Sequence, residues 1–531
     1  MKVIPLYKLP ISFPSVEQVK RKLTEIQSDL WIEHVNKACY EGIWSVLPLR
    51  GMTKNREAHP VLQAFQIEES QSESDYCNFP VLDQWPEIQL FLAQLSCPIL
   101  SVRLMKLAPK AEIKPHRDNG LSIEHGQARL HLCLTTHADV QFMVDGQSVD
   151  MAEGELWYIN ADKTHSVVNF SSEERIHLVI DCVGNDWLRN QLGIAESPSL
   201  RNMSSEERFP WLSSLCDKVI SCSQEERYGL RPVIREMVVG FSDYLNFELH
   251  PDKFRDDGYT LTSQGKAVSP TTAAQCAEEF LRTAVFLRGI HQAILNQRTC
   301  SQPVEVLYAG TGPFAMLILP LLTRFSAEQV SVSMLDIHGS SLENLSRLVD
   351  AFGVGDRIRG YFCADATVWS SDIQYDLIVS ETMKAALKEE PQVSVFARLV
   401  PFLKPTGTLI PEEIRLRAFV ANESGALVDL GPISTLNRVS CLCLSEGKRF
   451  ALDTQLTLPD EDAMALEIST EIQVYQTHVL TLNASSLTRL ESHQIEGSVN
   501  NTDITFEYQF GQVPGYRISR SLSNRVANSF N

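Results

Sequence analysis

The sequence KPHRDNG, residues 114–120, lies in the most informative region of the N-terminal part of the chain. It lies among short runs in which apolar and polar residues alternate, separated by polar or glycine-bearing turns. These runs are Ile99–Leu107, Ala128–Thr135, Val140–Val144, Glu155–Ile159, Ser166–Phe170 and Ile176–Asp181. Many short strands at near-regular spacing predict a β-sandwich or a β-barrel.

Two histidines and an aspartate in this stretch have a spacing that suits a metal ion. His116 and Asp118 are expected at the edge of one strand, and His165 at the start of another. Two imidazoles and one carboxylate form the facial triad of non-heme Fe(II) oxygenases, which leaves coordination positions open. An H-x-D triplet alone is a weak signal, because most exposed histidines and aspartates are simply solvated. Three other histidines are expected to be structural or to lie next to the metal ligands: His125, His137 and His177. They become candidate ligands only if His116 and His165 are the wrong choice.

Two arginines nearby suit a carboxylate ligand beside that metal. Arg175 follows the second histidine on the next predicted strand, and its planar guanidinium binds a carboxylate in bidentate fashion better than a lysine does. We therefore expect Arg175 to hold the far carboxylate of 2-oxoglutarate. Arg129 and His131 alternate on one strand face and are expected to add a second clamp.

Five segments of this region together resemble the aspartyl/asparaginyl β-hydroxylase family of 2-oxoglutarate oxygenases. In family order they are KPHRDNG (114–120), RLHLCL (129–134), GELWYIN (154–160), HSVVN (165–169) and RIHLVID (175–181). The resemblance covers about residues 80–190 and implies a cupin-type double-stranded β-helix. It assigns iron to His116, Asp118 and His165, and the co-substrate to Arg129, His131 and Arg175. Members of the family hydroxylate peptide residues or free amino acids, so the target is not implied.

From residue 304 the rhythm changes to strands that alternate with helices. The predicted strands are Val304–Ala309, Val330–Leu335, Tyr361–Ala364 and Asp376–Ser380, and the predicted helices are Phe314–Phe325 and Ser340–Phe352. This alternation predicts a parallel, doubly wound sheet. A long helix, Ala273–Leu295, is expected before it. A terminal β domain is expected after it, with strands Arg415–Val420, Ser440–Leu444, Ile472–Leu482 and Ile504–Phe510.

The loops of this predicted sheet suit an adenosine-containing ligand. Gly310 and Gly312 let the backbone approach it, Asp336 ends the second strand and suits the ribose hydroxyls, and Asp365 suits the adenine amino group. The third glycine of a dinucleotide fingerprint is missing. S-adenosylmethionine, which carries no phosphate, is therefore the favoured ligand over a pyrophosphate cofactor.

Two glutamates, Glu381 and Glu390, follow the fourth predicted strand. Paired acids there can hold a cationic nitrogen and direct its lone pair at a methyl sulfonium by electrostatic positioning. The plainer alternative is that residues 388–390 are a solvated helix face.

This half of the chain resembles the protein arginine methyltransferase family over about residues 270–531. The resemblance rests on VLYAGTGP (306–313), SE (380–381) with Glu390, ARL (397–399), LKPTGTLIP (403–411) and THV (477–479). It implies a Rossmann-like domain with a terminal β-barrel and a homodimer. It also assigns Arg282 to the cofactor carboxylate and His478 to a Thr-His-Trp loop.

The chain departs from that family's pattern at the acceptor pocket. Lys384 stands where the family has glycine, and Thr382 and Val479 replace aromatic residues. We expect Lys384 to pair with Glu381 and spoil a guanidinium pocket. Methyl transfer is therefore better supported than arginine as the acceptor.

Composition sets limits on the function. With 47 basic and 66 acidic residues among 531, the net charge is −19, which disfavours a nucleic-acid binder. No apolar run is long enough to span a membrane. The start of the chain lacks the plan of a signal peptide. The 12 cysteines are scattered without a C-x-x-C pair, which favours buried thiols in a reducing compartment, and we expect the cytoplasm.

These observations predict a multidomain, bifunctional enzyme. The expected domains are a hydroxylase (1–195), a helical linker with cofactor-covering helices (196–300), a Rossmann-like domain (301–412) and a β-barrel substrate domain (413–531). Hydroxylation of an unactivated C–H and methylation of nitrogen are expected on one peptide or peptide-derived natural product, such as a ribosomally made one (RiPP), or on a small molecule. The alternatives are a regulator that methylates arginine in a macromolecular partner, and a chain with one non-catalytic scaffold domain.

Overall fold

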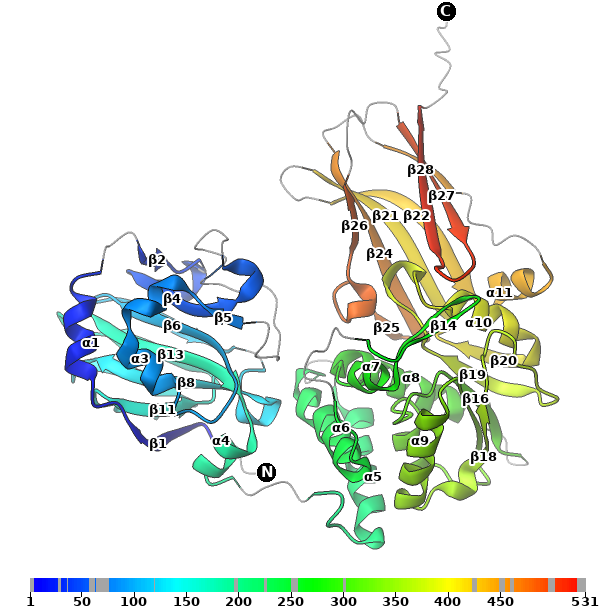
Figure 1. The fold of residues 1–531 in the computed structure, drawn as a ribbon, viewed down its shortest axis with the longest axis horizontal. Coiled ribbons are helices and arrows are strands. Elements are labelled where there is room, and N and C mark those ends of the chain that lie inside the picture. The colour runs from blue at the N-terminus through cyan, green and yellow to red at the C-terminus, as the bar shows by residue number, and fades with distance from the viewer. Residues whose placement is uncertain are drawn as a thin grey trace, which may run out of the picture. The chain divides into compact units, whose positions relative to one another are not determined.

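The computed structural model describes most of the chain and divides it into two compact units. The described residues are 4–26, 30–35, 37–56, 63, 76–118, 120–194, 199–223, 227–249, 256–298, 302–422, 427–447, 454–458, 463–494 and 502–522. One unit comprises residues 1–198 and the other residues 199–531 (Figure 1). The domain boundaries expected at 195–196 and 300–301 both lie outside the described residues.

The first unit consists of two antiparallel sheets. The larger has the order β1 (Leu6–Ser12), β11 (Glu155–Ile159), β8 (Gln127–Thr135), β13 (Arg175–Val183), β6 (Ile99–Leu107), β4 (Trp44–Met52) and β2 (Ile32–Glu33), with β5 (Tyr76–Asn78) also paired to β4. The smaller has the order β10 (Gln147–Ser148), β9 (Val140–Val144), β12 (His165–Asn169), β7 (Glu112–His116) and β3 (Tyr40–Glu41). The many short strands expected from alternation are confirmed, and each predicted strand agrees within two residues.

Alternation along the strands of the larger sheet separates two apolar layers. On β13, Leu178 and Ile180 belong to a core that includes Phe91 of α3 (Pro86–Leu92). Helices α1 (Val16–Leu23) and α4 (Asp186–Gln191) contribute to the same core. The intervening Val179 packs in a second core with Val167 of β12, so this face of the sheet meets the smaller sheet. Since successive side chains of a strand point to opposite faces, the odd-numbered residues of β13 lie between the two sheets.

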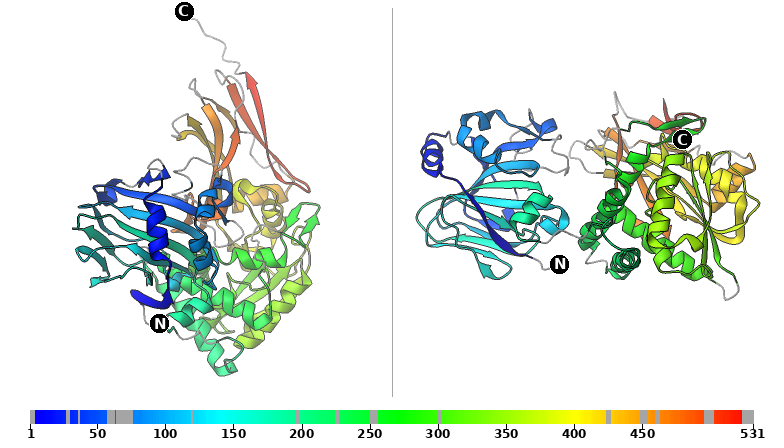
Figure 2. Two further views of the ribbon diagram at one scale, coloured as in Figure 1. Left: turned by 60° about the vertical axis from the view of Figure 1, so that its left-hand side comes forward. Right: turned by 60° about the horizontal axis from the view of Figure 1, so that its bottom comes forward.

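The second unit begins with helices that share its core. They are α5 (Ser205–Ser221), α6 (Arg231–Leu245), α7 (Pro270–Cys276) and α8 (Phe280–Gln297), with a hairpin of β14 (Thr260–Thr262) and β15 (Gly265–Ala267) before α7. In both views of Figure 2 these green helices lie against the rest of the second unit. Residues 199–298 are thus an integral part of this unit's packing.

A five-stranded sheet, parallel throughout, forms the centre of the second unit. Its order is β18 (Ile358–Cys363), β17 (Val330–Asp336), β16 (Val304–Ala309), β19 (Tyr375–Ser380) and β20 (Leu403–Ile410). Helix α9 (Gly339–Phe352) packs on β17 and β18, and α10 (Gln392–Leu399) on β19. The predicted parallel sheet is confirmed. The chain leaves β16 toward β17 and returns to β19 on its other side, and the crevice at such a reversal is where open α/β sheets bind ligands.

The C-terminal part of the second unit is antiparallel. One sheet contains β22 (Leu427–Asn437), β21 (Glu413–Asn422), β24 (Ala463–Tyr475), β25 (His478–Leu480) and β26 (Glu491–Gln494). The other contains β23 (Thr454–Thr457), β27 (Thr502–Gln509) and β28 (Gly515–Leu522). Where a single barrel was expected, the described strands form these two separate sheets.

The strand predicted at Ser440–Leu444 is wrong, because this segment is part of helix α11 (Arg438–Ser445). The side chain of Asn437 accepts a hydrogen bond from the Ser440 amide at 3.1 Å, and the Ser440 hydroxyl oxygen accepts one from the Asn437 amide at 2.8 Å. Such a reciprocal cap starts a helix. The alternation of Cys441 and Cys443, which suggested a strand, is also compatible with one buried and one half-buried position on a helix.

Two of the predicted helices are interrupted. In Phe314–Phe325 only the 3₁₀ turn Leu319–Thr323 is regular, because Pro320 lacks an amide donor and Ala315 has φ +40°. In Ala273–Leu295 the helix breaks between α7 and α8 at Glu279, whose ψ is +84° and whose carboxylate accepts hydrogen bonds from Ser485 and Ser486. Among the described helices, none combines the length and apolar character needed to cross a bilayer.

Candidate functional site

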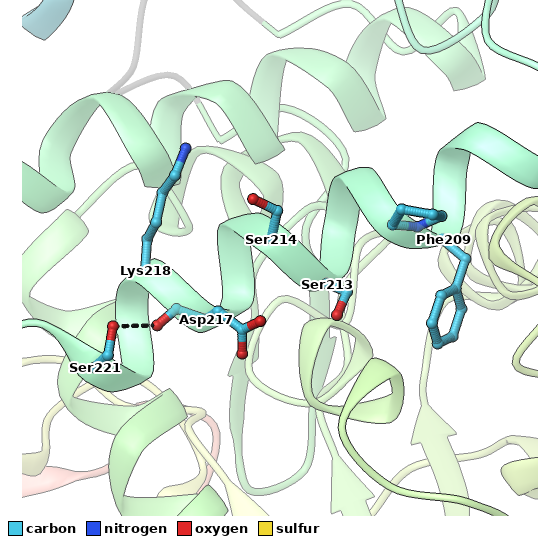
Figure 3. A pocket seen from close by; sticks show the side chains of 7 residues that line it. Phe209, Ser213, Ser214, Asp217, Lys218 and Ser221 are labelled. Atoms are coloured by element: carbon cyan, nitrogen blue, oxygen red, sulfur yellow. Dashed lines mark hydrogen bonds between the residues drawn. The ribbon is translucent and has the colours of Figure 1, made fainter.

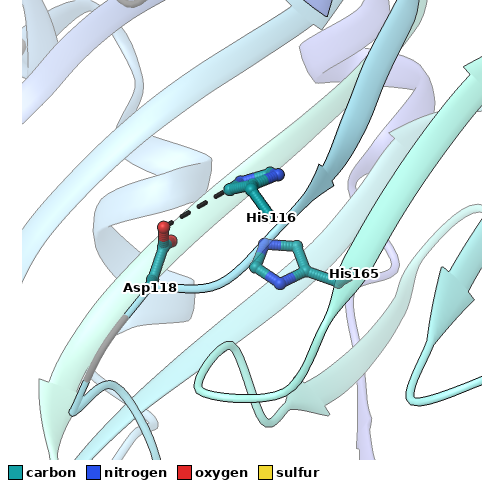
Figure 4. A group of neighbouring side chains, drawn as sticks. All are labelled: His116, Asp118 and His165. Carbon is teal, nitrogen blue, oxygen red and sulfur yellow. Dashed lines mark ion pairs between the residues drawn. The ribbon is translucent and has the colours of Figure 1, made fainter. Parts of the chain in front are cut away.

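His116, Asp118 and His165 come together at one end of the smaller sheet in the first unit. His116 ends β7 and His165 begins β12, and the antiparallel pairing of these strands makes the two histidines direct partners. One potential ligand atom from each of the three side chains lies within 4.8 Å of the other two (Figure 4). The structure therefore brings the three predicted metal ligands into one cluster.

The two imidazoles are held in the orientation that a metal requires. His116 Nδ1 lies 2.8 Å from the Lys114 carbonyl oxygen, and His165 Nδ1 lies 3.0 Å from the Lys163 carbonyl oxygen. A carbonyl only accepts, so each Nδ1 carries the proton and each Nε2 keeps its lone pair. Burial lowers the pKa of His165 to about 4, which keeps this imidazole in the neutral, metal-binding form.

Asp118 presents one carboxylate oxygen to this cluster. Its Oδ1 lies 3.9 Å from His116 Nε2, and its Oδ2 accepts a hydrogen bond from Nη1 of Arg129. Burial alone would raise the pKa of Asp118, but the charge of Arg129 opposes this most strongly, and the pKa lies below its ordinary value. Two imidazole nitrogens and one ionised carboxylate are the donor set of a 2-His-1-carboxylate iron site, so these residues fit Fe(II).

Arg129 binds two carboxylates of the chain, and its assignment to the co-substrate stays a prediction. Its Nε donates to Asp181 Oδ1 at 2.7 Å, its Nη2 to Asp181 Oδ2 at 3.1 Å, and its Nη1 to Asp118. Asp181 also accepts from Arg103 Nη2 at 2.7 Å and from the Ser101 hydroxyl at 3.1 Å. Asp181 and Arg103 were not predicted from the sequence. The alternation of residues 175, 177, 179 and 181 was a usable signal, because it puts Asp181 on the face of Arg175.

Arg175, the first residue of β13, is a buried cation that suits an anionic ligand. Its Nη2 lies 3.0 Å from His177 Nδ1, and its guanidinium lies 5.2 Å from the centre of the Phe142 ring. Among the described residues no carboxylate forms an ion pair with it. Burial lowers its pKa to about 10, yet it remains charged near neutral pH. A buried charge without a counter-ion is unfavourable, so the site is suited to bind a carboxylate.

Two buried imidazole nitrogens beside Arg175 also lack a partner. They are His131 Nδ1 and His177 Nε2, neither of which has a hydrogen bond within the described part of the chain. The two rings lie 5.7 Å apart, and His131 is on β8 next to β13. Burial, followed by the charge of Arg175, lowers the pKa of His131 well below its ordinary value, so it is neutral. These polar atoms and Arg175 fit the carboxylate end of 2-oxoglutarate.

His34 is a further residue near the triad that sequence reasoning missed. Its ring stacks on that of Trp44, with centroids 3.7 Å apart and planes 7° apart. Burial lowers its pKa to about 4, and the charges of Arg103 and Asp118 also act on it, so it lies beside the metal cluster. Nothing in the local sequence marks it, because its position depends on the pairing of β2 with β4.

The predicted cofactor loops of the second unit lie at the carboxyl ends of β16 and β17. Gly310 has φ +79° and Gly312 has φ +59°, a region that favours glycine, and a Cβ on Gly310 would lie 2.5 Å from Thr382 Cγ2. Asp336 ends β17 and accepts from the Gly312 amide and the His338 amide, both at 2.8 Å. Asp336 Oδ2 also accepts from the Thr311 hydroxyl at 3.3 Å, so Oδ1 is the oxygen with a further lone pair for a ribose hydroxyl.

Asp365 follows β18 and is occupied within its own turn. Its Oδ1 accepts from the Thr367 amide at 2.8 Å and from the Thr367 hydroxyl at 2.7 Å. The structure places it near Asp336 through the pairing of β17 with β18. Its assignment to an adenine amino group stays a prediction.

Arg282 and Glu381 form a buried ion pair, which the sequence did not predict. Arg282 lies on α8 and Glu381 follows β19, and Arg282 Nη1 also lies 3.8 Å from Glu279 Oε1. Lys384 pairs with Glu389 at 2.5 Å, so the expected pairing of Lys384 with Glu381 is wrong. Arg282 enters from α8 and takes that position. The pair with Glu381 uses Nη2 of Arg282, so a further carboxylate would have to bind through the remaining guanidinium nitrogens.

Glu390 is buried and carries an unusual acidity. Burial raises its pKa to about 7, although the charges of Arg282 and Lys384 oppose the rise. The preceding Glu389 accepts a hydrogen bond through its carbonyl from the Lys266 amide at 2.8 Å. The hairpin β14–β15 that carries Lys266 also reaches His338 through the Thr260 hydroxyl, at 3.1 Å. It thus touches the loops after β17 and β19, on either side of the β16 loop.

His478 is not joined to the predicted glutamate pair. It begins β25, is half-buried, and makes no hydrogen bond or ion pair with Glu381 or Glu390 in the described part of the chain. Burial lowers its pKa, followed by the charge of Arg288. Its assignment as a catalytic residue stays a prediction.

A shallow groove on the surface of α5 is unrelated to these residues. Its lining comes from residues 209–221 of that helix alone (Figure 3). The Ser221 hydroxyl donates to the Asp217 carbonyl at 2.7 Å, and the Asp217 carboxylate pairs with Arg324 at 2.9 Å. It contains no predicted site residue.

The N-terminal region combines a two-sheet fold with a His-Asp-His cluster. Residues 18–184 match the family model "Aspartyl/Asparaginyl beta-hydroxylase". L-proline cis-4-hydroxylase of Rhizobium meliloti (strain 1021) is 31% identical over 96 residues, which is 18% of this chain and 34% of that protein. The chain thus matches about a third of the length of this curated relative. These findings indicate an enzyme with a hydroxylase-like N-terminal region.

A solved structure is similar to the chain over a longer range but more weakly. It is a chain of the "Trypanosoma brucei PRMT1 enzyme-prozyme heterotetrameric complex with AdoHcy". The TM-score is 0.33 and the identity 12%, with 46% of this chain and 95% of that chain covered. A TM-score this low carries no argument about the second unit.

Proposed function

We propose that the first unit is an Fe(II)- and 2-oxoglutarate-dependent hydroxylase with a cupin-type double-stranded β-helix fold. The observation that carries the proposal is the cluster of His116, Asp118 and His165, with both Nδ1 atoms bonded to carbonyls and the ligand atoms within 4.8 Å. The match of residues 18–184 to a hydroxylase family supports it. When bound, the iron would supply the chemistry by which O₂, with 2-oxoglutarate as the two-electron reductant, hydroxylates an unactivated C–H.

The residues of the chain have separate tasks in this proposal. His116, Asp118 and His165 would hold the iron on one face. Arg175 would hold the far carboxylate of 2-oxoglutarate, with His131 and His177 offering their unpaired nitrogens. Their burial between two sheets excludes water, which strengthens the electrostatic attraction for the carboxylate.

We propose that the second unit is an S-adenosylmethionine-dependent methyltransferase with a Rossmann-like domain. The parallel sheet supports this, since its order reverses direction between β16 and β19. Gly310, Gly312 and Asp336 gather at that reversal, where a ligand is expected. Arg282 would bind the carboxylate of the cofactor through the guanidinium nitrogens that do not contact Glu381.

The acceptor that we propose is a nitrogen atom other than that of an arginine side chain. A guanidinium needs ionised carboxylates, but Glu381 is paired with Arg282, and Glu389 with Lys384. Glu390 is left, and its raised pKa of about 7 makes it only partly charged near neutral pH. The alternative, a regulator that methylates arginine in a protein partner, requires Arg282 to release Glu381 as the cofactor binds.

The whole chain is proposed to be a bifunctional tailoring enzyme of the cytoplasm. Both families that the sequence resembles act on amino-acid side chains, so a peptide or a peptide-derived natural product is the proposed substrate of both units. A homodimer belongs to the same proposal. Mass spectrometry of peptides encoded by neighbouring genes tests it, with arginine-rich proteins as the comparison. The expected products gain one oxygen atom and one CH₂ unit on the same peptide. Products found only on arginine-rich proteins would favour the regulator.

Turnover of 2-oxoglutarate tests the hydroxylase directly. The purified full chain with Fe(II), O₂ and 2-oxoglutarate should form succinate, faster when a substrate with a C–H to be hydroxylated is present. His116→Ala should form none. The exposed His137→Ala is the matched control, because it removes an imidazole from the same unit without touching the cluster. Equal succinate formation by wild type and His116→Ala would contradict the proposal.

Calorimetry with S-adenosylmethionine tests the second site. Asp336→Ala should weaken binding by roughly 10-fold or more, because charged hydrogen bonds to the ribose are lost. Asp356→Ala removes an exposed carboxylate from the same unit and should leave the affinity unchanged. No binding to wild type would remove the methyltransferase from the proposal and leave the scaffold alternative.

A further inference from the structure

Four charged side chains form a continuous chain that ends on the metal cluster. Their order is Asp118, Arg129, Asp181 and Arg103, and we call them the four-charge chain. Acid and base alternate along it, so the buried charges sum to zero. Only Asp118 belongs to the predicted triad. We infer that Asp181 is a positioning residue of the metal site, acting through Arg129 on Asp118. This inference rests on the hydroxylase proposed above.

Strand pairing fixes the middle of the four-charge chain. Asp181 on β13 is the direct partner of Arg129 on β8 and of Ser101 on β6. Residues paired across neighbouring strands point to the same face, so their side chains meet between the two sheets. Asp181 therefore holds Arg129 from the centre of the larger sheet, which is a rigid support.

The contacts of Arg129 divide its guanidinium between two carboxylates. Nε and Nη2 bind the two oxygens of Asp181 at 2.7 and 3.1 Å, as a planar fork does with a carboxylate. The remaining Nη1 donates to Oδ2 of Asp118. Because Asp181 fixes the plane of the guanidinium, it also fixes the direction in which Nη1 points.

This contact decides which oxygen of Asp118 is available. Oδ2 is taken by Arg129, and Oδ1 lies 3.9 Å from His116 Nε2. The bond to Arg129 therefore favours binding of the metal through Oδ1 alone. A carboxylate bound through one oxygen uses one coordination position, whereas binding through both would use a position needed by other ligands. Groups that hydrogen-bond to a ligating carboxylate commonly tune metal affinity in this way.

A plain structural role is the competing explanation, because buried charges need counter-charges whatever they neighbour. Under that explanation Asp181 only neutralises Arg129 and Arg103. The two explanations differ when Asp181 and Arg103 are removed together. The double variant keeps the charge balance of the wild type, but it leaves Arg129 without its fork partner.

Mn(II) binding to the full chain, measured by electron paramagnetic resonance, tests the inference without turnover. Asp181→Asn should raise the Kd for Mn(II) by about 10- to 100-fold, the range for outer partners of metal ligands. Asp181→Asn with Arg103→Met should still raise the Kd by about 10-fold. Ser101→Ala removes a neutral donor to Asp181 Oδ2, the oxygen that also accepts from Arg129 Nη2. Its Kd for Mn(II) should stay within about twofold of the wild-type value. The Co(II) absorption spectrum should change in both Asp181 variants and not in Ser101→Ala.

The outcomes distinguish a failure of the positioning role of Asp181 from a failure of the hydroxylase proposal. If wild type and His116→Ala bind Mn(II) equally, the hydroxylase proposal fails. If wild type binds and folded Asp181→Asn binds as tightly, or if the double variant regains wild-type affinity and spectrum, the positioning role is overturned. Should Asp181→Asn not fold, the charge-balanced double variant carries the test, and failure of both to fold would assign Asp181 a structural role instead.

Discussion

The two candidate sites of this protein treat their charged groups in opposite ways. In the first unit, His116, Asp118 and His165 turn ligand atoms toward one another, and Arg175 is buried without a carboxylate partner in the described residues. In the second unit, Arg282 is paired with Glu381, and Lys384 with Glu389. The first site is arranged for ligands that are still to bind, whereas the second has satisfied its charges internally.

This difference shows that similar charged residues can form a site that is ready to bind a ligand or one whose charges are already paired. A preorganised site binds its ligand at a small free-energy cost of rearrangement. A site whose charged groups are paired with one another has a larger cost, because those contacts must rearrange. The apparent association constant of a ligand equals its intrinsic value multiplied by the fraction of molecules in the binding-competent state. We therefore expect the first unit to bind its ligands without a conformational step, and the second to rearrange the side chain of Arg282.

The largest expected effect concerns the ligands of the first site. His116→Ala removes one of three ligands, and we expect metal affinity to fall by more than about 1000-fold, or about 4 kcal/mol. Metal titration of the full chain measures it. His137→Ala is the control and should bind as wild type. If His116→Ala kept the metal affinity of the wild type, His116 would not be a metal ligand, and the first site would not be the preorganised one.

Arg282→Met should produce the next largest effect, on the stability of the second unit. It leaves Glu381 buried without its partner, which costs about 3–5 kcal/mol. Hydrogen exchange at peptides of α8 and β19 measures the local loss, because it separates the two units. Lys384→Met breaks a more exposed pair and should cost about 1 kcal/mol or less. Equal losses for both variants would mean that Arg282 and Glu381 are not a tightly held pair.

Arg175→Met should weaken 2-oxoglutarate binding by roughly 100-fold, or about 2.7 kcal/mol, because a bidentate charged contact is lost. Calorimetry in the presence of Mn(II) measures this Kd, and the Kd for Mn(II) should be unchanged. Arg175→Lys keeps the charge but loses the fork, so its Kd should lie between those of wild type and Arg175→Met. An unchanged 2-oxoglutarate Kd in Arg175→Met would separate this arginine from the co-substrate.

The smallest expected effect is the pH dependence that Glu390 gives to the second unit. Burial raises its folded pKa to about 7 from an ordinary value of 4.5, so the folded state holds the proton more tightly. Its contribution to stability is complete below about pH 4.5 and is lost as the pH rises to about 7, by about 2–3 kcal/mol.

Hydrogen exchange at the peptides around Glu390, followed across this pH window, measures that loss. Glu390→Gln should flatten the profile, while Glu389→Gln should leave its slope in place. A wild-type profile that rises with pH in this window would contradict the assignment.

Local patterns predicted the elements that carry the first site. Alternation in 99–181 identified six strands within two residues but gave no range for β7, which carries His116. The spacing of His116, Asp118 and His165 anticipated their cluster. These features depend on residues that are close in sequence or on the same strand face, which is why a pattern can reveal them. The parallel sheet of the second unit was predicted for the same reason, since short apolar-rich strands alternate with helices along the sequence.

Contacts that depend on which strand or helix lies next to which were not predicted. Asp181 holds Arg129 only because β13 pairs with β8, and Arg282 reaches Glu381 only because α8 packs beside β19. Lys384, expected on Glu381, instead pairs with Glu389 five residues away along the same loop. A long-range partner competes with a local one at Glu381, and sequence spacing does not decide between them.

The most direct test of the central claim is an anaerobic titration of the full chain with Fe(II) and 2-oxoglutarate, followed by visible absorption. If His116, Asp118 and His165 hold iron while Arg175 holds the co-substrate, the wild type develops a weak charge-transfer band that saturates at one equivalent of each. The band is then absent in His116→Ala. A wild type that binds both components without the band, or a band that persists in His116→Ala, would contradict the account.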